Sequence, residues 1–161
     1  MSAIARFIKM PLSAIDGLRK AAIPQKRLFR GTIDLYNDYL RQHGQEVAQY
    51  RWSGYVLATL LPYLAEKRRI DLMNSEQGEL AEFLCRTRGA THFIFTSAQR
   101  KSLLDQLATD LFSQDEMRGY FNEFNGTNED EIGSAMLDGV VAFRECLGQL
   151  DDESVIVFMI A

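Results

Sequence analysis

Hydrophobic residues follow two different periods along this chain, which separate expected strands from expected helices. Three short runs are rich in β-branched and aromatic residues: AIARFIKM at 3–10, ATHFIFT at 90–96 and SVIVFMI at 154–160. Runs of this length and composition are typical of β-strands. The last run is apolar at consecutive positions, as in a strand covered on both faces of a sheet. We expect it to pair with the other two in a sheet of about three strands that includes both chain termini. The alternative is that it forms the final turn of a helix.

Elsewhere the apolar residues have the three- and four-residue spacing of amphipathic helices. A short helix is expected over 11–24, opened by Ser13 and Asp16 as a capping box. The segment QKRLFRG at 25–31 is expected to form a loop, after which Thr32 caps the next helix. Further helices are expected over 47–64, 75–88, 97–112, 113–125 and 132–150.

Two local features refine this helical pattern. Pro62 has no backbone N–H to donate, which predicts a kink or an early end in the helix over 47–64. Ser113 and Glu116 have the spacing of a second capping box, so a tight turn at 112–114 is expected between two helices. The chain shows no repeats or linkers, and we expect residues 1–161 to fold as a single α+β domain, with a mainly helical body packed against the small sheet.

Composition is that of an ordinary globular protein, with 47% hydrophobic and 25% charged residues. No segment approaches the roughly 20 apolar residues of a membrane span. Arg6 and Lys9 interrupt the apolar run near the N-terminus, so we expect no secretory signal. Cys85 and Cys146 fall among apolar helical positions and are expected to be reduced thiols. These features favour a cytoplasmic protein with no membrane contact.

Charge is distributed unevenly along the chain, although the net charge is only −4. Residues 1–30 contain seven basic side chains and Asp16, a net charge of +6, whereas residues 102–161 contain thirteen carboxylates and two arginines, a net charge of −11. One interpretation is that the two ends neutralise each other or are ordinary solvated faces. The other is that the acidic surplus creates a negative field that attracts a basic partner and repels nucleic acid.

Catalytic and metal-binding patterns are weak. His43 and His92 are far apart, and no paired-cysteine or paired-histidine spacing predicts a metal or any other cofactor. Cys85 and His92 are the best candidates for a nucleophile and its base, but a core thiol and a strand histidine are the favoured interpretation. Arg86 and Arg88, which precede His92, form a possible anion pocket, although arginines at a helix end are common without one.

The acidic residues make better sense as contacts with another molecule. They occur in three groups, each at the end of an expected helix, where loops gather at the rim of a helical body. The candidate partner-binding residues are Asp115, Glu116, Glu129, Asp130, Glu131, Asp151, Asp152 and Glu153. If two or more groups converge, they form a negative patch that attracts a basic partner. Tyr120 and Phe124 are candidate anchors, although burial in the core is the more common fate of such residues.

The order of these elements is similar to that of the YfbM-like family, small bacterial proteins with a domain of unknown function. The resemblance includes a first strand, a helical middle that contains Trp52, the block THFIFTSAQRKSLLDQLATDLFSQDEMRGYF, a long helix and the terminal strand VIVFMIA. It covers most of the chain in layout and is most specific over residues 90–161. It implies a cytoplasmic bacterial protein, of a kind that can occur as the partner of a toxin, and it supplies no family site residues.

We therefore expect a non-enzymatic interaction protein, most concretely an immunity protein that binds a cognate toxin domain and occludes its active site with an acidic surface. The expected partner is basic, and no nucleic acid is expected. The alternative is a small-molecule-binding or enzymatic domain with an anion pocket near Arg86, Arg88 and His92.

Overall fold

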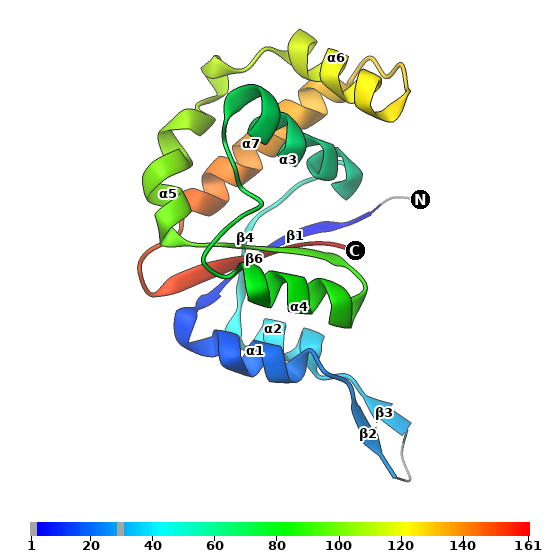
Figure 1. The fold of residues 1–161 in the computed structure, drawn as a ribbon, viewed down its shortest axis with the longest axis vertical. Coiled ribbons are helices and arrows are strands. Elements are labelled where there is room, and N and C mark those ends of the chain that lie inside the picture. Colours follow the sequence, from blue (N-terminus) through cyan, green and yellow to red (C-terminus); the bar gives the residue numbers. More distant parts are fainter. Residues whose placement is uncertain (1–2, 29–30) are drawn as a thin grey trace.

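The structure, a computed structural model, describes residues 3–28 and 31–161. Its main sheet has four antiparallel strands in the order β4-β1-β6-β5 (Figure 1). These strands are β1 (Ala5–Pro11), β4 (Gln45–Ala48), β5 (Thr91–Phe95) and β6 (Ser154–Ile160). The prediction that the apolar tail pairs with both earlier runs is confirmed, because β6 lies between β1 and β5. The sheet has four strands rather than about three, since β4 was not expected.

Strand β6 is the centre of the hydrophobic core, and all seven of its residues are buried. Its side chains alternate between two core clusters, as the two-residue period of a strand requires. Ile156, Phe158 and Ile160 face one cluster, and Val155, Val157 and Met159 face the other. Ile4 and Ala161 extend the pairing beyond the strands through two backbone hydrogen bonds of 2.7 and 3.1 Å. This double coverage explains why the tail has almost no polar residues.

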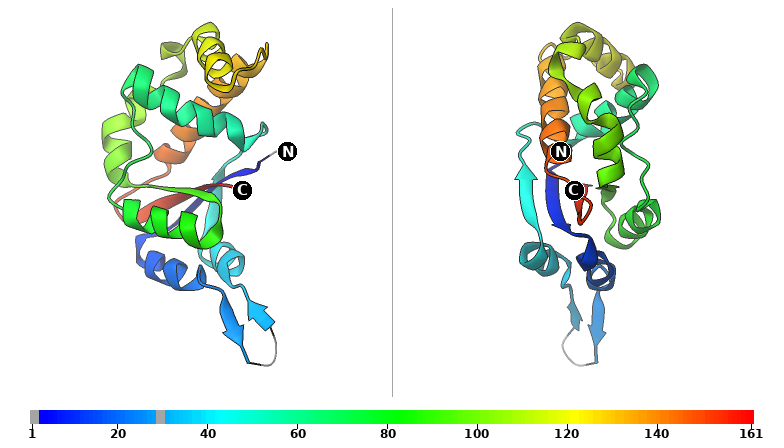
Figure 2. Two further views of the ribbon diagram at one scale, coloured as in Figure 1. Left: turned by 45° about the vertical axis from the view of Figure 1, so that its right-hand side comes forward. Right: turned by 90° about the vertical axis from the view of Figure 1, so that its left-hand side faces the viewer.

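Helices cover both faces of the sheet (Figures 1 and 2). On one face lie α1 (Ile15–Ala21), α2 (Tyr36–His43) and α4 (Gly78–Arg88). The other face holds α3 (Gly54–Arg68), α5 (Ser97–Leu103) and α7 (Ile132–Gly148), with α6 (Gln114–Asn125) packed on α3 and α7. Short 3-10 turns occupy Leu12–Ala14, Leu104–Leu107 and Thr109–Leu111. The α+β class with a mainly helical body is therefore confirmed.

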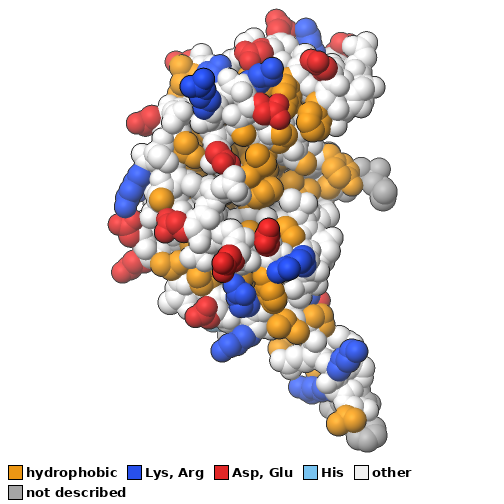
Figure 3. All heavy atoms as spheres, in the orientation of Figure 1, with side chains coloured by type: hydrophobic (Ala, Val, Ile, Leu, Met, Phe, Trp, Pro, Cys, Tyr) orange, Lys and Arg blue, Asp and Glu red, His pale blue; other side chains and the backbone are white. Residues whose placement is uncertain are grey.

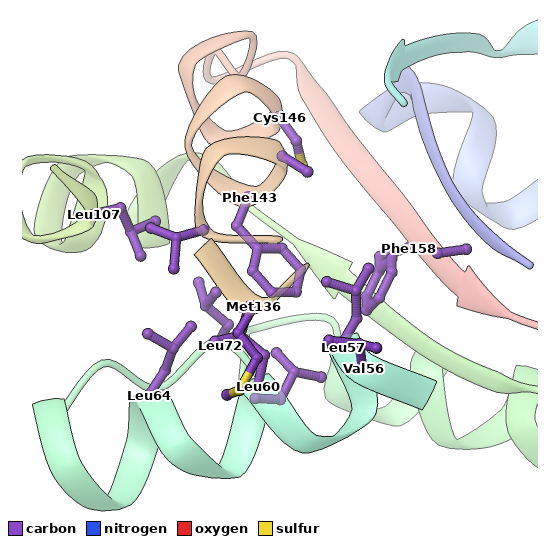
Figure 4. Close-up of a cluster of buried hydrophobic side chains, with 14 of the residues drawn as sticks. Val56, Leu57, Leu60, Leu64, Leu72, Leu107, Met136, Phe143, Cys146 and Phe158 are labelled. Carbon is purple, nitrogen blue, oxygen red and sulfur yellow. The ribbon is translucent and has the colours of Figure 1, made fainter. Parts of the chain in front are cut away.

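The larger core cluster lies between the sheet and the helices α3 and α7 (Figure 4). The ring of Phe158 stacks on that of Phe7 at a centroid distance of 4.7 Å, and the edge of Phe143 meets Phe158 at 5.4 Å. All three rings are fully buried. Because aromatic pairs add to the free energy of area burial, this contact between α7 and the central strands is a main source of stability.

The segment expected as one helix over 47–64 is instead a strand followed by a helix. Val47 and Ala48 belong to β4, and α3 begins only at Gly54, where the Ser53 hydroxyl accepts a hydrogen bond from the Tyr55 amide. The helix continues past Pro62 to Arg68. Of the two outcomes expected at Pro62, a kink or an early end, the early end is wrong, because buried residues on both sides of the proline hold this part of α3 against the core.

The expected loop at 25–31 and the expected cap at Thr32 are also wrong. Strands β2 (Gln25–Arg27) and β3 (Gly31–Ile33) form an antiparallel hairpin, and part of the expected loop, residues 29–30, lies outside the described residues. Thr32 is in β3, and the Asp34 carboxylate accepts a hydrogen bond from the Tyr36 amide at the start of α2. We call residues 25–28 and 31–33 the arm, because they project from the end of the molecule (Figure 2).

The remaining local predictions have mixed outcomes. Ser113 caps α6 as expected, its hydroxyl accepting a hydrogen bond from the Glu116 amide. Ser13 caps no helix, because a 3-10 turn precedes α1. The expected helix over 97–112 stops at Leu103 and continues as 3-10 turns. Cys85 and Cys146 are free thiols, as expected.

Candidate protein-binding surface

Helix α6 and the loop that follows it carry two of the three predicted acidic groups. Met117 and Phe121, four residues apart, point into the core, so the opposite side of the helix faces solvent. Asp115 and Glu116 lie in the first turn, where carboxylates interact favourably with the helix dipole. The helix ends at Gly126, whose φ of 64° lies in the left-handed region that glycine adopts easily.

The side chain of Asn122 fixes the loop that follows α6. Its carbonyl oxygen accepts hydrogen bonds from the Thr127 hydroxyl and the Glu129 amide, both 2.9 Å long. Its amide nitrogen donates to the Glu129 carbonyl at 3.2 Å. The loop therefore runs back beside α6, and the carboxylates of Glu129, Asp130 and Glu131 emerge next to this helix.

The start of α7 contacts the start of α6. The Ser134 hydroxyl donates a hydrogen bond of 3.1 Å to the side-chain oxygen of Gln114, and Gly133 lies against the Gln114 backbone. Glu131 precedes α7 directly, and Asp115 follows Gln114 directly. The structure thus brings together two of the three predicted groups, Asp115 with Glu116 and Glu129 with Asp130 and Glu131.

The third predicted group lies elsewhere. Asp151, Asp152 and Glu153 follow the other end of α7, a helix of 17 residues whose length is about 25 Å. The Asp151 carboxylate lies 3.8 Å from the Lys9 ammonium, and that of Asp152 lies 2.6 Å from Lys101. Hydrogen bonds from the Ser154 hydroxyl and the Glu153 amide lower the pKa of Asp151, and the contact with Lys101 lowers that of Asp152. These residues form an ion-paired turn that starts β6.

Phe124 is the apolar feature beside the converging acids. Its side chain is 57% exposed, and its ring stacks on Tyr120 at a centroid distance of 5.8 Å. The Tyr120 hydroxyl donates a 3.0 Å hydrogen bond to Glu66 of α3, so Tyr120 has a fixed position. The preceding residue, Glu123, is exposed and was not among the predicted site residues, although its place on the solvent side of α6 was readable from the helical period. A held aromatic ring beside carboxylates fits the chemistry of a protein contact.

We call Asp115, Glu116, Glu123, Phe124, Glu129, Asp130 and Glu131 the acidic end. Residues 114–131 contain six carboxylates against the single cation Arg118, a net charge of −5. Arg118 pairs with Asp115 at 3.0 Å, and the other five carboxylates form no ion pair with a described residue. Burial, together with the neighbouring Glu116 carboxylate, raises the pKa of Tyr63 beneath this surface to about 12. Figure 3 shows acidic and basic side chains together at the upper end of the molecule, and the Lys67 ammonium of α3 lies 6.0 Å from the centroid of the Tyr120 ring.

The alternative site near Arg88 and His92 is a set of internal contacts. The Arg88 guanidinium donates two hydrogen bonds, of 3.0 and 2.6 Å, to the Asp34 carboxylate. It also donates to the Ala22 carbonyl at 3.3 Å and lies over the Tyr36 ring. Arg88 is thus occupied by neighbours, and Arg86 is exposed on α4.

His92 is almost fully buried in the same cluster. Its Nδ1 donates to the Ala90 carbonyl at 2.9 Å, which leaves Nε2 to accept the 2.8 Å hydrogen bond from the Tyr36 hydroxyl. Burial lowers the pKa of His92 and raises that of Tyr36, so both rings are neutral near pH 7. The Cys85 sulfur accepts from the His92 amide rather than facing its ring. An adjacent groove of about 350 Å³ is lined by Glu79 and Glu82, whose charges disfavour an anion.

Comparison of the chain with protein-family models, curated proteins and solved structures finds no match. The resemblance to the YfbM-like family stays a prediction. Among the described residues there is no group of three or more histidine, cysteine or carboxylate side chains arranged to hold a metal ion. Within the same residues, no helix has the length and apolar character needed to cross a membrane.

Proposed function

We propose that this protein is a non-enzymatic interaction protein that binds a basic protein partner through the acidic end. The observation that supports this most directly is the juxtaposition of one half-exposed phenylalanine and five carboxylates that form no ion pair with a described residue. Charged rims increase association rates and select partners, while aromatic anchors contribute much of the binding energy. Asn122 and Tyr120 hold these groups in place before binding, which reduces the entropic cost of association.

In its more specific form, the proposal is that the partner is a toxin domain and that this chain is its immunity protein. The resemblance to the YfbM-like family motivates this form. An acidic surface would compete for the basic residues with which a nucleic-acid-degrading enzyme holds phosphates. Bound in this way, the protein would occlude the toxin's active site without any chemical reaction of its own.

Affinity capture from the native host tests the general proposal. The wild type is compared with the charge-reversal variant E123K/E129K and with E82K/E145K, which makes the same charge change at exposed carboxylates on α4 and α7. We expect a basic protein in stoichiometric amount with the wild type and with E82K/E145K, and an at least roughly tenfold loss with E123K/E129K. Equal capture by all three proteins, or no stoichiometric basic partner with the wild type, would contradict the proposal.

Coexpression tests the immunity role. The captured partner, expressed alone, is expected to stop growth, and growth should return with the wild type or E82K/E145K but not with E123K/E129K. A partner that is harmless when expressed alone would rule out the immunity role while leaving the interaction itself intact.

A further inference from the structure

The arm is a second exposed feature, at the end of the molecule opposite α6 (Figures 1 and 2). Its strands pair in register, with Gln25 opposite Ile33 and Lys26 opposite Thr32. Apart from the partly buried Ile33, all its described residues are exposed. Leu28, which follows β2, is 95% exposed, the largest value among the exposed hydrophobic residues of the described chain. A leucine in this position contributes nothing to the core.

The base of the arm is fixed to the body of the protein. Ala22 precedes β2 and Asp34 follows β3, and the guanidinium of Arg88 hydrogen-bonds both. The side chain of Arg88 is only 15% exposed, and it stacks over Tyr36, which in turn hydrogen-bonds His92 of the sheet. Because the partly buried guanidinium of Arg88 holds both entry points, the arm projects in a defined direction.

The arm is basic as well as apolar. Lys26 and Arg27 are exposed, and neither forms an ion pair with a described residue. Arg19 and Lys20 of the adjacent α1 are exposed, and so is Ile23, at 53%. Figure 3 shows lysine and arginine side chains along the arm and a hydrophobic one near its tip. The arm is therefore a cationic hairpin that exposes one hydrophobic side chain, Leu28.

The acidic end has the complementary chemistry, with Phe124 as its apolar group and carboxylates around it. The arm and the acidic end lie at opposite ends of the long axis of the molecule, so one chain cannot join them (Figure 1). A second copy can.

We propose that the arm of one molecule docks on the acidic end of a second copy, with Leu28 against Phe124 and Lys26 and Arg27 facing Glu123 and Glu129. This inference rests on the same surface as the proposed function, so a basic partner and the arm would compete for it. Contact between two different surfaces is heterologous and forms open chains unless the rotation between copies closes a ring. A hairpin tip buries little area, so the association is weak and falls with added salt. Nucleic acid is a poorer occupant, because the exposed leucine finds no apolar pocket on phosphates and the net charge of −4 opposes approach.

Sedimentation equilibrium of the purified protein over about 10 to 500 µM tests the proposal, since contacts of this size give weak complexes. At about 50 mM NaCl we expect the average mass to rise continuously past that of a dimer, and at about 500 mM it should return to the monomer. L28S and F124S should each lower the association constant at least about tenfold. Y55S, which changes a 54% exposed position on α3, should associate as the wild type does.

Mixing the two defective variants gives the sharpest result. L28S retains an intact acidic end and F124S an intact arm, so the mixture should form a one-to-one heterodimer that does not grow further. A monomeric wild type at the highest concentration, unchanged association in L28S or F124S, or a mixture that stays monomeric would overturn the proposal. Binding of a 20-base-pair DNA duplex that is lost in K26E/R27E, without self-association, would assign the arm to nucleic acid instead.

The two proposals fail separately. If capture of a basic partner fails while the variant mixture forms its heterodimer, the proposed function is wrong and the self-association stands. If E123K/E129K loses a captured partner but the wild type is monomeric at every concentration, the proposed function stands and the self-association is wrong.

Discussion

Arg88 joins three separate parts of the fold, because it connects α4 to both ends of the arm and to Tyr36. Removing it takes the Arg88 hydrogen bonds from the Ala22 carbonyl and the Asp34 carboxylate, and Asp34 keeps the one from the Tyr36 amide. We expect R88A to lower the free energy of unfolding by about 1–3 kcal/mol, because these hydrogen bonds involve a charged, mostly buried donor. R88K should recover part of this, since a lysine keeps the charge but not the two parallel hydrogen bonds.

Urea denaturation measures this effect, and R86A is the matched control on the same helix. Arg86 is exposed, so its removal should change stability by no more than about 0.5 kcal/mol. Equal effects of R88A and R86A would mean that Arg88 does not anchor the arm.

His92 gives a prediction for pH. Burial lowers its pKa below the ordinary value of 6.5, so the unfolded state takes up a proton at a higher pH than the folded state. Stability should therefore fall as the pH drops below about 6.5, where the unfolded chain binds more protons. Arg88, Tyr36 and Cys85 contact this ring or lie beside it.

The comparison is urea denaturation at pH 7 and pH 5 for the wild type and for H92Q, in which the glutamine cannot titrate. H92Q should lose the part of the pH dependence that lies in this window, whatever its overall stability. An unchanged difference between the two pH values would show that His92 is not the group responsible.

Two phenylalanines of opposite burial give a further residue-level prediction. Phe158 is fully buried among Phe7, Phe95 and Phe143, and F158A should cost about 3–5 kcal/mol through lost burial and a residual cavity. Phe124 is 57% exposed, so F124A should change the free energy of unfolding by no more than about 0.5 kcal/mol. A large stability loss in F124A would mean that Phe124 is a structural residue rather than an available anchor.

At the level of elements, the contact between α6 and α7 decides where the acidic groups meet. A Cβ atom added at Gly133 would lie 2.4 Å from the backbone carbonyl oxygen of Gln114, which cannot move without shifting α6. G133A should therefore destabilise the protein by about 1–3 kcal/mol. Gly119 of α6 has open space around it, so G119A should stabilise the helix by about 0.5–1 kcal/mol. Thermal melts of both variants check these opposite signs, and a neutral G133A would contradict the close approach.

The elements that the sequence predicts well are those with a strong internal pattern. The run at 155–160 is apolar at every position, so its burial on both faces was readable without the fold. Strand β4 could not be predicted from the sequence, because its residues QEVA contain only two apolar positions and its pairing with β1 is a long-range contact. The arm was missed for a related reason: its residues are mostly polar and exposed, and hydrogen bonds with β3, rather than burial, make β2 a strand.

The candidate site was predictable only in part. The carboxylates themselves are visible in the sequence, but their grouping depends on tertiary contacts. Asn122 holds the loop of Glu129 against α6, and Gly133 lets α7 approach Gln114. Neither contact has a short-range signal. Asp151 and Asp152 have the same local pattern as the other acids, yet they pair with Lys9 and Lys101 at the other end of α7.

Considered as a whole, the molecule has an acidic aromatic end and a basic arm separated by the sheet and its helices (Figure 1). The opposite charges of the two ends of the sequence do not cancel each other fully. Lys9 pairs with Asp151, whereas Lys26 and Arg27 remain far from the carboxylates of the acidic end. This separation supports two different binding surfaces, one for a basic partner and one for an acidic surface.

Hydrogen exchange of the complex with the captured partner is the most direct test of the central claim that the acidic end binds protein. Binding of the partner at the acidic end should slow the exchange of the amides of 114–131, with little change in α1 and α2. Unchanged exchange over 114–131, with protection confined to another surface, would contradict it.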